Sequence, residues 1–472
     1  MKGRSLRRPL TERAKERSRA LAGRSVLRGW PSLLFLFFLS TPLFVVSGYA
    51  PDGALFCTLY DLPKGCLIAA AGPLFCGLFC VALARNPEAA AQAGAFFRRA
   101  LGFKLLFLLL ILMALAGLAA PVKAAAGFTF GNFFLLTLLG LVLAGLFRRV
   151  ALRWAAVYGL LAALVIFSVF GIVQFAGYRI PFLMPILGPA STLGYRNPAA
   201  DFIALVLPFV FFAAWRQWRR RRADRGRGAL LLVGALLLAA GAALALLFMN
   251  YSRAAILALL VEALVLSVWL FWRKAEGPDP GWRRRGLRAL LAALLLTGLM
   301  LVLVMSFTQS RRRVMASFEN LRRGGVARLL EFRYYHWGNT LMMIKENPVL
   351  GVGPGNWRFT YPLYYQSFAK DPLFNYKMQV RRAHNDYLQL AAECGIPALL
   401  VFLWLWGRQF YLLRYPEPTG DEADWRLPLL ASLSAFSVIM FFSFPLQMAY
   451  SRMFCFFLLA LGEARVWPEL SK

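Results

Sequence analysis

Two polar segments of this chain combine residue types suited to proton transfer and anion binding. One is ENPVLGVGPGNW at 346–357, and the other is AHNDYLQLAAECGI at 383–396. The chain contains two histidines, and both lie in or beside the basic stretch 309–383. An imidazole exchanges a proton near neutral pH, so His384 is a candidate general base at the end of this stretch. We expect a structural role for His336, which lies on a predicted helix beside an aromatic residue.

Two arginines stand at the edges of apolar segments. The sequence MNYSRAAIL places Arg253 at the start of one apolar run, and YRNPAADF places Arg196 and Asn197 at the start of another. A charged side chain near membrane depth is costly and usually faces a polar cavity. We therefore expect Arg253 to face such a cavity. The Asn-Pro pair is a turn signal, so a structural role is favoured for Asn197 over a catalytic one.

The stretch 309–383 carries thirteen Lys and Arg residues against four acidic ones. An anionic ligand is the simplest explanation for this excess. Within it, LLEFRYYHWGNTLMMIKENP at 329–348 predicts an amphipathic helix that ends at Pro348, with Arg333 beside its apolar stripe. The stripe comprises Leu330, Tyr334, Trp337, Leu341 and Ile344. The sequence GVGPGN at 351–356 predicts a turn whose N–H groups could bind an anion.

The elements that must position these residues are apolar helices. The chain is 60% hydrophobic, with a mean hydropathy of +0.58. Its apolar segments approach the ~20 residues that span a bilayer as a helix, the form that satisfies the backbone in hydrocarbon. The segments are 31–50, 66–84, 104–120, 128–147, 153–176, 199–215, 229–249, 254–272, 289–308, 385–407, 427–446 and 450–466. The sequence therefore predicts an all-α, polytopic integral membrane protein with about twelve transmembrane helices.

Basic residues set the predicted orientation, because Lys and Arg concentrate in cytoplasmic loops. The N-terminal tail carries ten of them. Further clusters occupy every second loop, near 85–104, 148–153, 216–227, 273–288 and 408–426. This alternation predicts cytoplasmic termini and an outer location for 309–383. The predicted organisation is a basic tail (1–28), helices one to nine (29–308), an outer loop domain of short helices (309–383), helices ten to twelve (384–466) and a second tail (467–472).

The same composition argues against several classes of protein. The net charge of +32 is mainly a topology signal, with contact to anionic membrane lipids as a secondary use. The arginine cluster at 216–227 flanks a predicted span, which favours orientation over nucleic-acid binding. The histidines and cysteines show no metal-ligand spacing, and no glycine-rich nucleotide loop occurs, so we expect no cofactor. Cys57 and Cys66 could form a disulfide in an oxidising compartment, but spacing alone does not fix the geometry.

Taken together, these motifs resemble the O-antigen ligase and polymerase superfamily, the Wzy/WaaL-like polytopic glycosyltransferases. The resemblance rests on Arg333 followed by Trp337, on ENPVLGVGPGNW and on HNDYLQLAAECG, with the Asn-Pro pair at 197–198 and Ser252–Arg253 in matching order. The sequence departs from the family at IPAL, 396–399, where a glycine is usual. We expect this departure to alter the start of a helix more than the chemistry.

The resemblance implies transfer of a glycan from undecaprenyl diphosphate to an acceptor hydroxyl, such as a sugar of the lipid A core. The transfer would take place at the periplasmic face of the bacterial inner membrane, without metal or ATP. Arg253 and Arg333 would bind the diphosphate leaving group, since guanidinium binds phosphate bidentately. His384 would accept or orient the acceptor's proton. The expected substrate-binding residues are Arg196, Asn197, Gly353, Asn356, Arg381, Arg382, Asn385 and Tyr387. A lateral opening between spans should admit the prenyl tail.

Three alternatives remain open at this point. An O-antigen or exopolysaccharide polymerase of the same superfamily uses the same residue types, and so does a protein glycosylase. A membrane transporter belongs to another class, and it should place ionisable groups near the bilayer midplane. The deepest candidate here is Glu262, while the other charges cluster outside the spans. That distribution favours an enzyme over a transporter, and the resemblance implies that the enzyme acts in lipopolysaccharide or cell-envelope synthesis.

Overall fold

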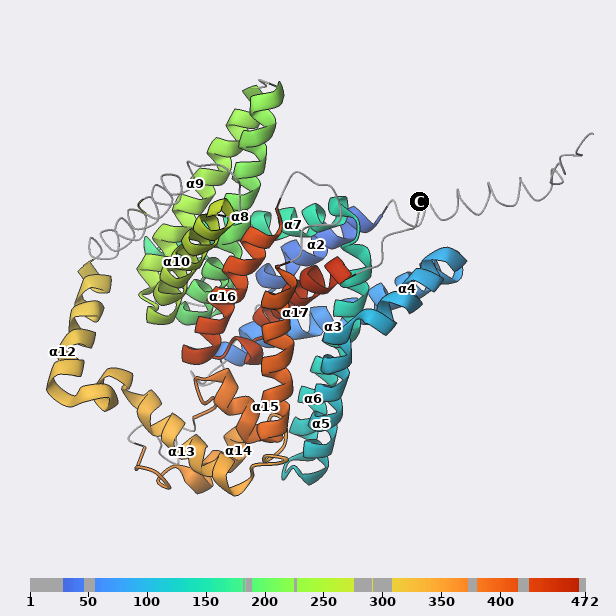
Figure 1. Ribbon diagram of the computed structural model, residues 1–472. Helices are drawn as coiled ribbons and strands as arrows, with labels where there is room; N and C mark the ends of the chain where they lie inside the picture. The colour runs from blue at the N-terminus through green and yellow to red at the C-terminus, as the bar shows by residue number, and fades with distance from the viewer. Residues whose placement is uncertain are drawn as a thin grey trace, which may run out of the picture.

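The computed structural model describes residues 29–45, 56–180, 183, 189–224, 227–275, 291, 308–371, 380–414 and 424–466. These residues form an all-helical fold in which no strand occurs (Figure 1). The α-helices are α2 (Trp30–Leu43), α3 (Phe56–Ala84), α4 (Pro87–Arg99), α5 (Leu101–Ala119), α6 (Lys123–Leu146), α7 (Val150–Phe175), α8 (Arg196–Asp224), α9 (Arg227–Asn250), α10 (Arg253–Ala275), α12 (Thr308–Leu330), α13 (Phe332–Glu346), α14 (Trp357–Tyr364), α15 (Asp386–Leu412), α16 (Arg426–Phe442) and α17 (Ala449–Glu463). Short 3-10 turns are η2 (Ser191–Leu193), η3 (Pro445–Gln447) and η4 (Ala464–Val466).

The helices follow the apolar segments of the sequence, which confirms the predicted all-α class. Within the described residues, seven helices are long and apolar enough to cross a membrane, namely Tyr60–Ala84 of α3, α5, α6, α7, Arg196–Arg220 of α8, Gly228–Asn250 of α9, and α15. Helices α2 and α16 are apolar but shorter, with 14 and 17 residues. Of the predicted segment 289–308, the structure describes only residues 291 and 308. The total of about twelve spans therefore stays a prediction.

Helix α17 forms the centre of the bundle (Figure 1). All fifteen of its residues are buried. The ring of Phe457 packs at centroid distances of 5.1 to 5.6 Å against Phe38 of α2, Phe209 of α8 and Phe147, the residue that follows α6. Large apolar side chains instead point outward on peripheral helices, as at Leu238, which is 77% exposed on α9. An apolar exterior around an equally apolar core is what a bilayer solvent permits.

The predicted outer segments gather at one end of this bundle (Figure 1). The side-chain amide of Asn356 accepts a hydrogen bond from the Val122 N–H at 2.8 Å and donates one to its carbonyl at 3.2 Å. These bonds join the turn between α5 and α6 to the loop before α14. The C-terminal ends of α15 and α17 meet through the Arg408–Glu463 ion pair, at 2.9 Å. That pair joins helix ends that the charge pattern assigns to the cytoplasmic side.

Helix α13 confirms the predicted helix but corrects its limits and its buried face. A break at Glu331 separates it from α12, and it ends at Glu346 before Pro348. The predicted apolar stripe is not buried throughout, because Leu341 is 48% exposed. The buried face is largely polar, and it consists of His336, Gly338, Asn339, Thr340, Met343 and Ile344. Hydrogen bonds within the loop domain, rather than apolar periodicity, select this face.

Helix α15 is kinked at Gly395, directly before the IPAL sequence. Gly395 has φ +84°, a conformation that favours glycine, and a Cβ there would collide with the backbone of Val349. The N–H of Ile396 bonds outside the helix, to the carbonyl of Pro348 at 2.8 Å. Pro397 then begins the second helical part, a position where a missing N–H costs little. The break lies at Gly395, one residue before IPAL, and the expected effect of this departure on a helix start stays a prediction.

Candidate functional site

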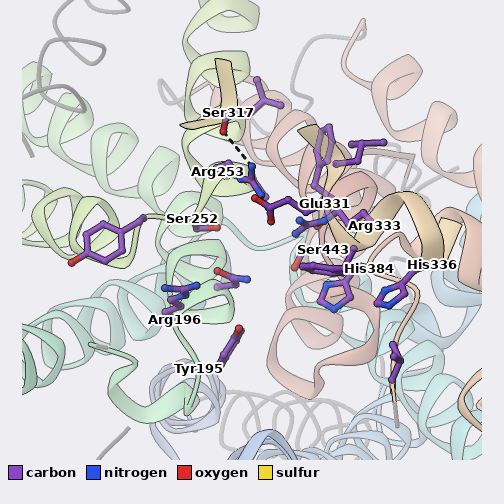
Figure 2. Close-up of a pocket in the computed structure, with 18 of the residues that line it drawn as sticks. Tyr195, Arg196, Ser252, Arg253, Ser317, Glu331, Arg333, His336, His384 and Ser443 are labelled. Atoms are coloured by element: carbon purple, nitrogen blue, oxygen red, sulfur yellow. Dashed lines mark hydrogen bonds and ion pairs between the residues drawn. The ribbon is translucent and has the colours of Figure 1, made fainter. Parts of the chain in front are cut away.

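A cavity of about 800 Å³ lies among the first turns of α8 and α10, the α12–α13 junction, the segment before α15 and the end of α16 (Figure 2). Its lining brings together six residues that the sequence nominated: Arg196, Asn197, Arg253, Arg333, Arg381 and His384. Segments nearly two hundred residues apart thus converge on one space. The remaining five nominated residues lie outside this lining.

The wall formed by α8 and α10 supplies cations. Figure 2 shows Tyr195 and Arg196 across the cavity from the two histidines. Arg253 is the first residue of α10, and its guanidinium is held in two directions. One nitrogen lies 3.0 Å from the carboxylate of Glu331, and the other donates to Ser317 at 3.2 Å. Arg253 keeps 32% of its side chain exposed, so its guanidinium remains open to a ligand.

Arg333 supplies the cation of the opposite wall. Its Nε donates to the carbonyl of Phe442 at 3.1 Å, which leaves the other guanidinium nitrogens for further partners. Burial, together with the nearby charge of Arg253, lowers the pKa of Arg333 to about 10, although the charge of Glu331 opposes this change. The side chain therefore stays charged at neutral pH. Two like charges that line one cavity are unfavourable alone and favour an anionic ligand.

His384 lies beside these cations in a largely aromatic setting. Its ring packs at 5.0 Å from Phe332 and 4.9 Å from Phe444, and it stacks on His336 at 6.1 Å. Removal from water lowers the pKa of His384 well below its usual value, and the charges of Arg333 and Arg382 act in the same direction. The imidazole is therefore neutral at neutral pH and can accept a hydrogen bond.

Backbone strain is concentrated around this cavity. Among the described residues, four other than glycine have positive φ: Ser191, Tyr251, Glu331 and His384. The last three line the cavity, with φ values of +53°, +56° and +56°. Each such conformation costs about 1–3 kcal/mol and persists only where the surrounding structure imposes it. Strain of this kind is typical of positions whose side chains must point into a site.

His336 also lines the cavity, although the sequence favoured a structural role. Its Nε2 lies 2.9 Å from Oδ2 of Asp371, and these side chains are 2% and 0% exposed. The contact is close but poorly aligned for a hydrogen bond. Within the described part of the chain, its Nδ1 has no hydrogen-bond partner.

Two nominated residues belong to the glycine-rich turn, and both make contacts within the protein. The predicted turn is present, with positive φ at Gly351, Gly353 and Gly355. A Cβ at Gly353 would approach Ala120 to 2.3 Å, so the residue permits close packing against α5. The anion that this turn binds is a side chain of the protein itself, because the carboxylate of Glu393 accepts from Gly355 N–H at 2.8 Å. Asn356 holds the α5–α6 turn, as described above.

The other three nominated residues outside the cavity lining, Arg382, Asn385 and Tyr387, lie around the start of α15. The Asn385 side chain caps this helix, accepting from the Leu388 N–H at 3.0 Å. Tyr387 donates to the carbonyl of Ser437 at 3.3 Å and so links α15 to α16. Arg382 interacts electrostatically with Asp386 and Glu393, while its neighbour Arg381 lines the cavity. Substrate contact by these three residues stays a prediction.

Several cavity residues were missed by sequence reasoning: Tyr195, Tyr251, Ser317, Glu331 and Ser443. Only Glu331 carried a usable signal, since it is one of four acidic residues in a strongly basic stretch.

Cys66, considered for a disulfide, is an exposed free thiol. In the part of the chain that the structure describes, no group of three or more His, Cys, Asp or Glu side chains is arranged to hold a metal ion.

Comparison with known families agrees with this site. Residues 238–403 match the family model Wzy_C, described as O-Antigen ligase. The matched segment contains Arg253, Arg333 and His384, and it ends within α15. No relative among curated proteins matches the chain. The family match confirms the resemblance to the O-antigen ligase and polymerase superfamily.

Proposed function

We propose that this multi-pass protein, which carries an O-antigen ligase domain, transfers a glycan from undecaprenyl diphosphate to an acceptor hydroxyl. The observation that carries the proposal is the convergence of Arg253, Arg333 and His384 on one cavity. The family match supports an enzyme that handles a glycan or lipid-linked sugar. The lipid A core is the acceptor class that we propose.

The arginines fit the demands of the leaving group. As the anomeric carbon separates from the diphosphate oxygen, both electrons of that bond leave with the diphosphate. Guanidinium groups stabilise the developing charge, and charge-assisted hydrogen bonds of this type contribute about 1.5–3 kcal/mol each. The lipid diphosphate is already an activated donor, so the reaction needs no nucleotide.

Glu331 indicates how an anion would bind to Arg253. A carboxylate oxygen of Glu331 lies 3.0 Å from a guanidinium nitrogen of Arg253. Both side chains remain partly exposed, at 32% for Arg253 and 45% for Glu331. Exposed ion pairs typically contribute only about 0.2–1 kcal/mol, so a dianionic ligand can displace this one. A phosphate group would then take the position of the Glu331 carboxylate, with Ser317 as a further donor.

The acceptor would approach from the histidine side of the cavity. His384 is neutral, lines the cavity and is positioned to accept or orient the hydroxyl proton. Inverting transfer requires the hydroxyl and the leaving group on opposite faces of the sugar. Figure 2 shows Arg253 and His384 at separate places on the wall, which suits this arrangement.

Arg196, Asn197 and Arg381 complete the proposed substrate contacts, since all three line the same cavity. We further propose that this end of the bundle faces the periplasm, as the distribution of basic loops predicts. Joining repeat units on the same carrier, as a polymerase does, would use the same donor chemistry and differs only in the acceptor.

A transfer assay with purified protein tests the proposal. The protein, in lipid nanodiscs, is supplied with an undecaprenyl-diphosphate-linked glycan and with either lipid A core or a second lipid-linked repeat unit. Product on lipid A core supports the ligase, and product only on the lipid-linked unit supports the polymerase. The absence of transfer to either, with donor bound, would overturn the proposal. Lipopolysaccharide banding in a deletion strain gives the matching result in cells.

A further inference from the structure

Asp201 is a buried carboxylate inside α8 that the proposed transfer has not yet used. The residue is 2% exposed, and it lies in the part of α8 that is long and apolar enough to cross a membrane. One carboxylate oxygen, Oδ2, accepts a hydrogen bond from the Ser443 hydroxyl at 3.0 Å. Within the described residues the other oxygen, Oδ1, has no hydrogen-bond partner. An ionisable group inside a span is costly to bury and usually marks a functional position.

The end of α16 connects this carboxylate to the cavity. Phe442 is the last residue of α16, Ser443 follows it, and both line the cavity. The carbonyl of Phe442 accepts the hydrogen bond from Nε of Arg333 at 3.1 Å. Carbonyls in the last turn of a helix have no partner within that helix, so a cationic donor is favoured there. The end of α16 thus binds Arg333 of α13 at one residue and Asp201 of α8 at the next.

The charges of Asp201 and Arg333 also act on each other. The attraction between the two groups opposes the repulsion that Arg333 receives from Arg253. The hydrogen bonds run through Ser443 and Phe442, so they use only Nε of the guanidinium. Glu331 differs in this respect, because its carboxylate lies directly on the guanidinium of Arg253. Asp201 therefore stabilises a cation of the site without taking the place of a phosphate.

We propose that Asp201 is a positioning residue for Arg333, acting through Ser443 and the end of α16. It fixes the segment that carries the Phe442 carbonyl, and it counters the charge of Arg333. Both effects keep the guanidinium at the place where the diphosphate leaves. Asp201 touches no substrate in this role. The inference rests on the transfer reaction proposed above and adds no chemical step to it.

A double-mutant cycle with Arg333 tests the proposal, because a residue that acts through Arg333 loses its effect once Arg333 is removed. The variants are Asp201→Ala, Arg333→Ala and their combination, in the full-length protein, assayed in nanodiscs with saturating donor and lipid A core. Asp201→Ala should lower turnover by at least about 5-fold when Arg333 is present, but by less than about 2-fold in the Arg333→Ala background. A merely structural loss would lower turnover by the same factor in both backgrounds.

Asp61→Ala is the matched control for this cycle. The carboxylate of Asp61 also joins two helices, since it accepts a hydrogen bond from the Ala449 N–H at 2.6 Å and so links α3 to α17. Asp61→Ala should change turnover by the same factor with and without Arg333. A second variant, Asp201→Asn, should lose less turnover than Asp201→Ala, because its amide oxygen can still accept a hydrogen bond from Ser443.

The outcomes separate this inference from the proposed function. If wild-type protein transfers glycan but Asp201→Ala stays within about 2-fold of wild type, or loses the same factor in both backgrounds, the positioning role is wrong and the transferase stands. Wild-type protein that binds donor and transfers nothing overturns the transferase, and this inference falls with it. If Asp201→Ala does not fold, Ser443→Ala decides by the same cycle, since it removes only the hydroxyl that joins Asp201 to the end of α16.

Discussion

The carboxylate of Glu393 accepts hydrogen bonds from two backbone N–H groups, from Gly355 of the glycine-rich turn at 2.8 Å and from Trp357, the first residue of α14, at 3.3 Å. A residue of α15 thus binds the start of α14 and fixes the loop domain to the helix that follows His384. The turn has the geometry of an anion site, and the protein fills it with its own carboxylate.

We therefore predict a structural effect for Glu393→Ala. Two N–H groups would lose their acceptor, and the buried one, of Trp357, would cost about 1–3 kcal/mol. The melting temperature of the purified protein should fall. The melting temperature of Glu393→Gln should fall less, because its amide oxygen can still accept a hydrogen bond. An unchanged melting temperature with lost turnover would instead place Glu393 in the chemistry.

Arg333→Ala should lower glycan transfer by at least about 10-fold at unchanged membrane abundance, because it removes a charge-assisted bond to the leaving group. Arg333→Lys should rescue only in part, since a point charge cannot make the bidentate contact. Arg253→Ala should show a loss of similar size. Lys345, exposed at the end of α13, gives the control: Lys345→Ala should transfer normally. Full activity of Arg333→Ala would remove this residue from the site.

Glu331→Gln should bind the lipid diphosphate more tightly. The substitution removes the carboxylate that competes for Arg253, and the gain is small because both side chains are partly exposed. We expect about 2–5-fold tighter donor binding at low salt and less at high salt. Isothermal titration with undecaprenyl diphosphate measures it. Weaker binding would mean that Glu331 holds Arg253 in place rather than competing for it.

His384→Ala should lower turnover by at least about 10-fold while donor binding stays nearly intact. His384→Gln should retain more activity, because an amide can still hydrogen-bond the acceptor hydroxyl. The neutral state of His384 follows from its lowered pKa, so raising the pH above neutrality should not increase turnover through this residue. The reaction should also survive EDTA. Inhibition by the chelator would contradict the metal-free mechanism that the resemblance implies.

The sequence indicated much of the site because its key residues sit at recognisable boundaries. Arg253 begins an apolar segment, and His384 ends the basic stretch just before another. Both fall on the cavity, together with Arg333. Apolar runs also predicted the helices, since a bilayer leaves few alternatives for such segments.

The remaining features depend on tertiary contacts that no local pattern encodes. Hydrophobic periodicity on α13 predicted that Leu341 is buried. The buried face is instead set by hydrogen bonds that Asn339 donates to Tyr365 and that Thr340 accepts from Trp357. The partner of His336 is Asp371, which lies thirty-five residues further along the chain. Glu393 accepts a hydrogen bond from the glycine-rich turn. The sequence contains this residue but does not show that it lies next to the turn in space.

The last prediction concerns the side of the membrane that the cavity faces. Contacts of Asn356 with Val122 place the α5–α6 turn at the same end as the loop domain, and the Arg408–Glu463 pair lies at helix ends assigned to the other side. Reporter fusions after Lys123 and Lys345 should therefore behave alike, and both should be active only with a periplasmic reporter. Fusions after Arg99 and at Lys472 should be active only with a cytoplasmic one. If the fusions after Lys123 and Lys345 report the same side of the membrane, the fold is supported. Which side they report tests the predicted orientation. A cytoplasmic location for both would keep the cavity intact but turn it away from the proposed periplasmic substrates, and the transfer reaction would then need another acceptor.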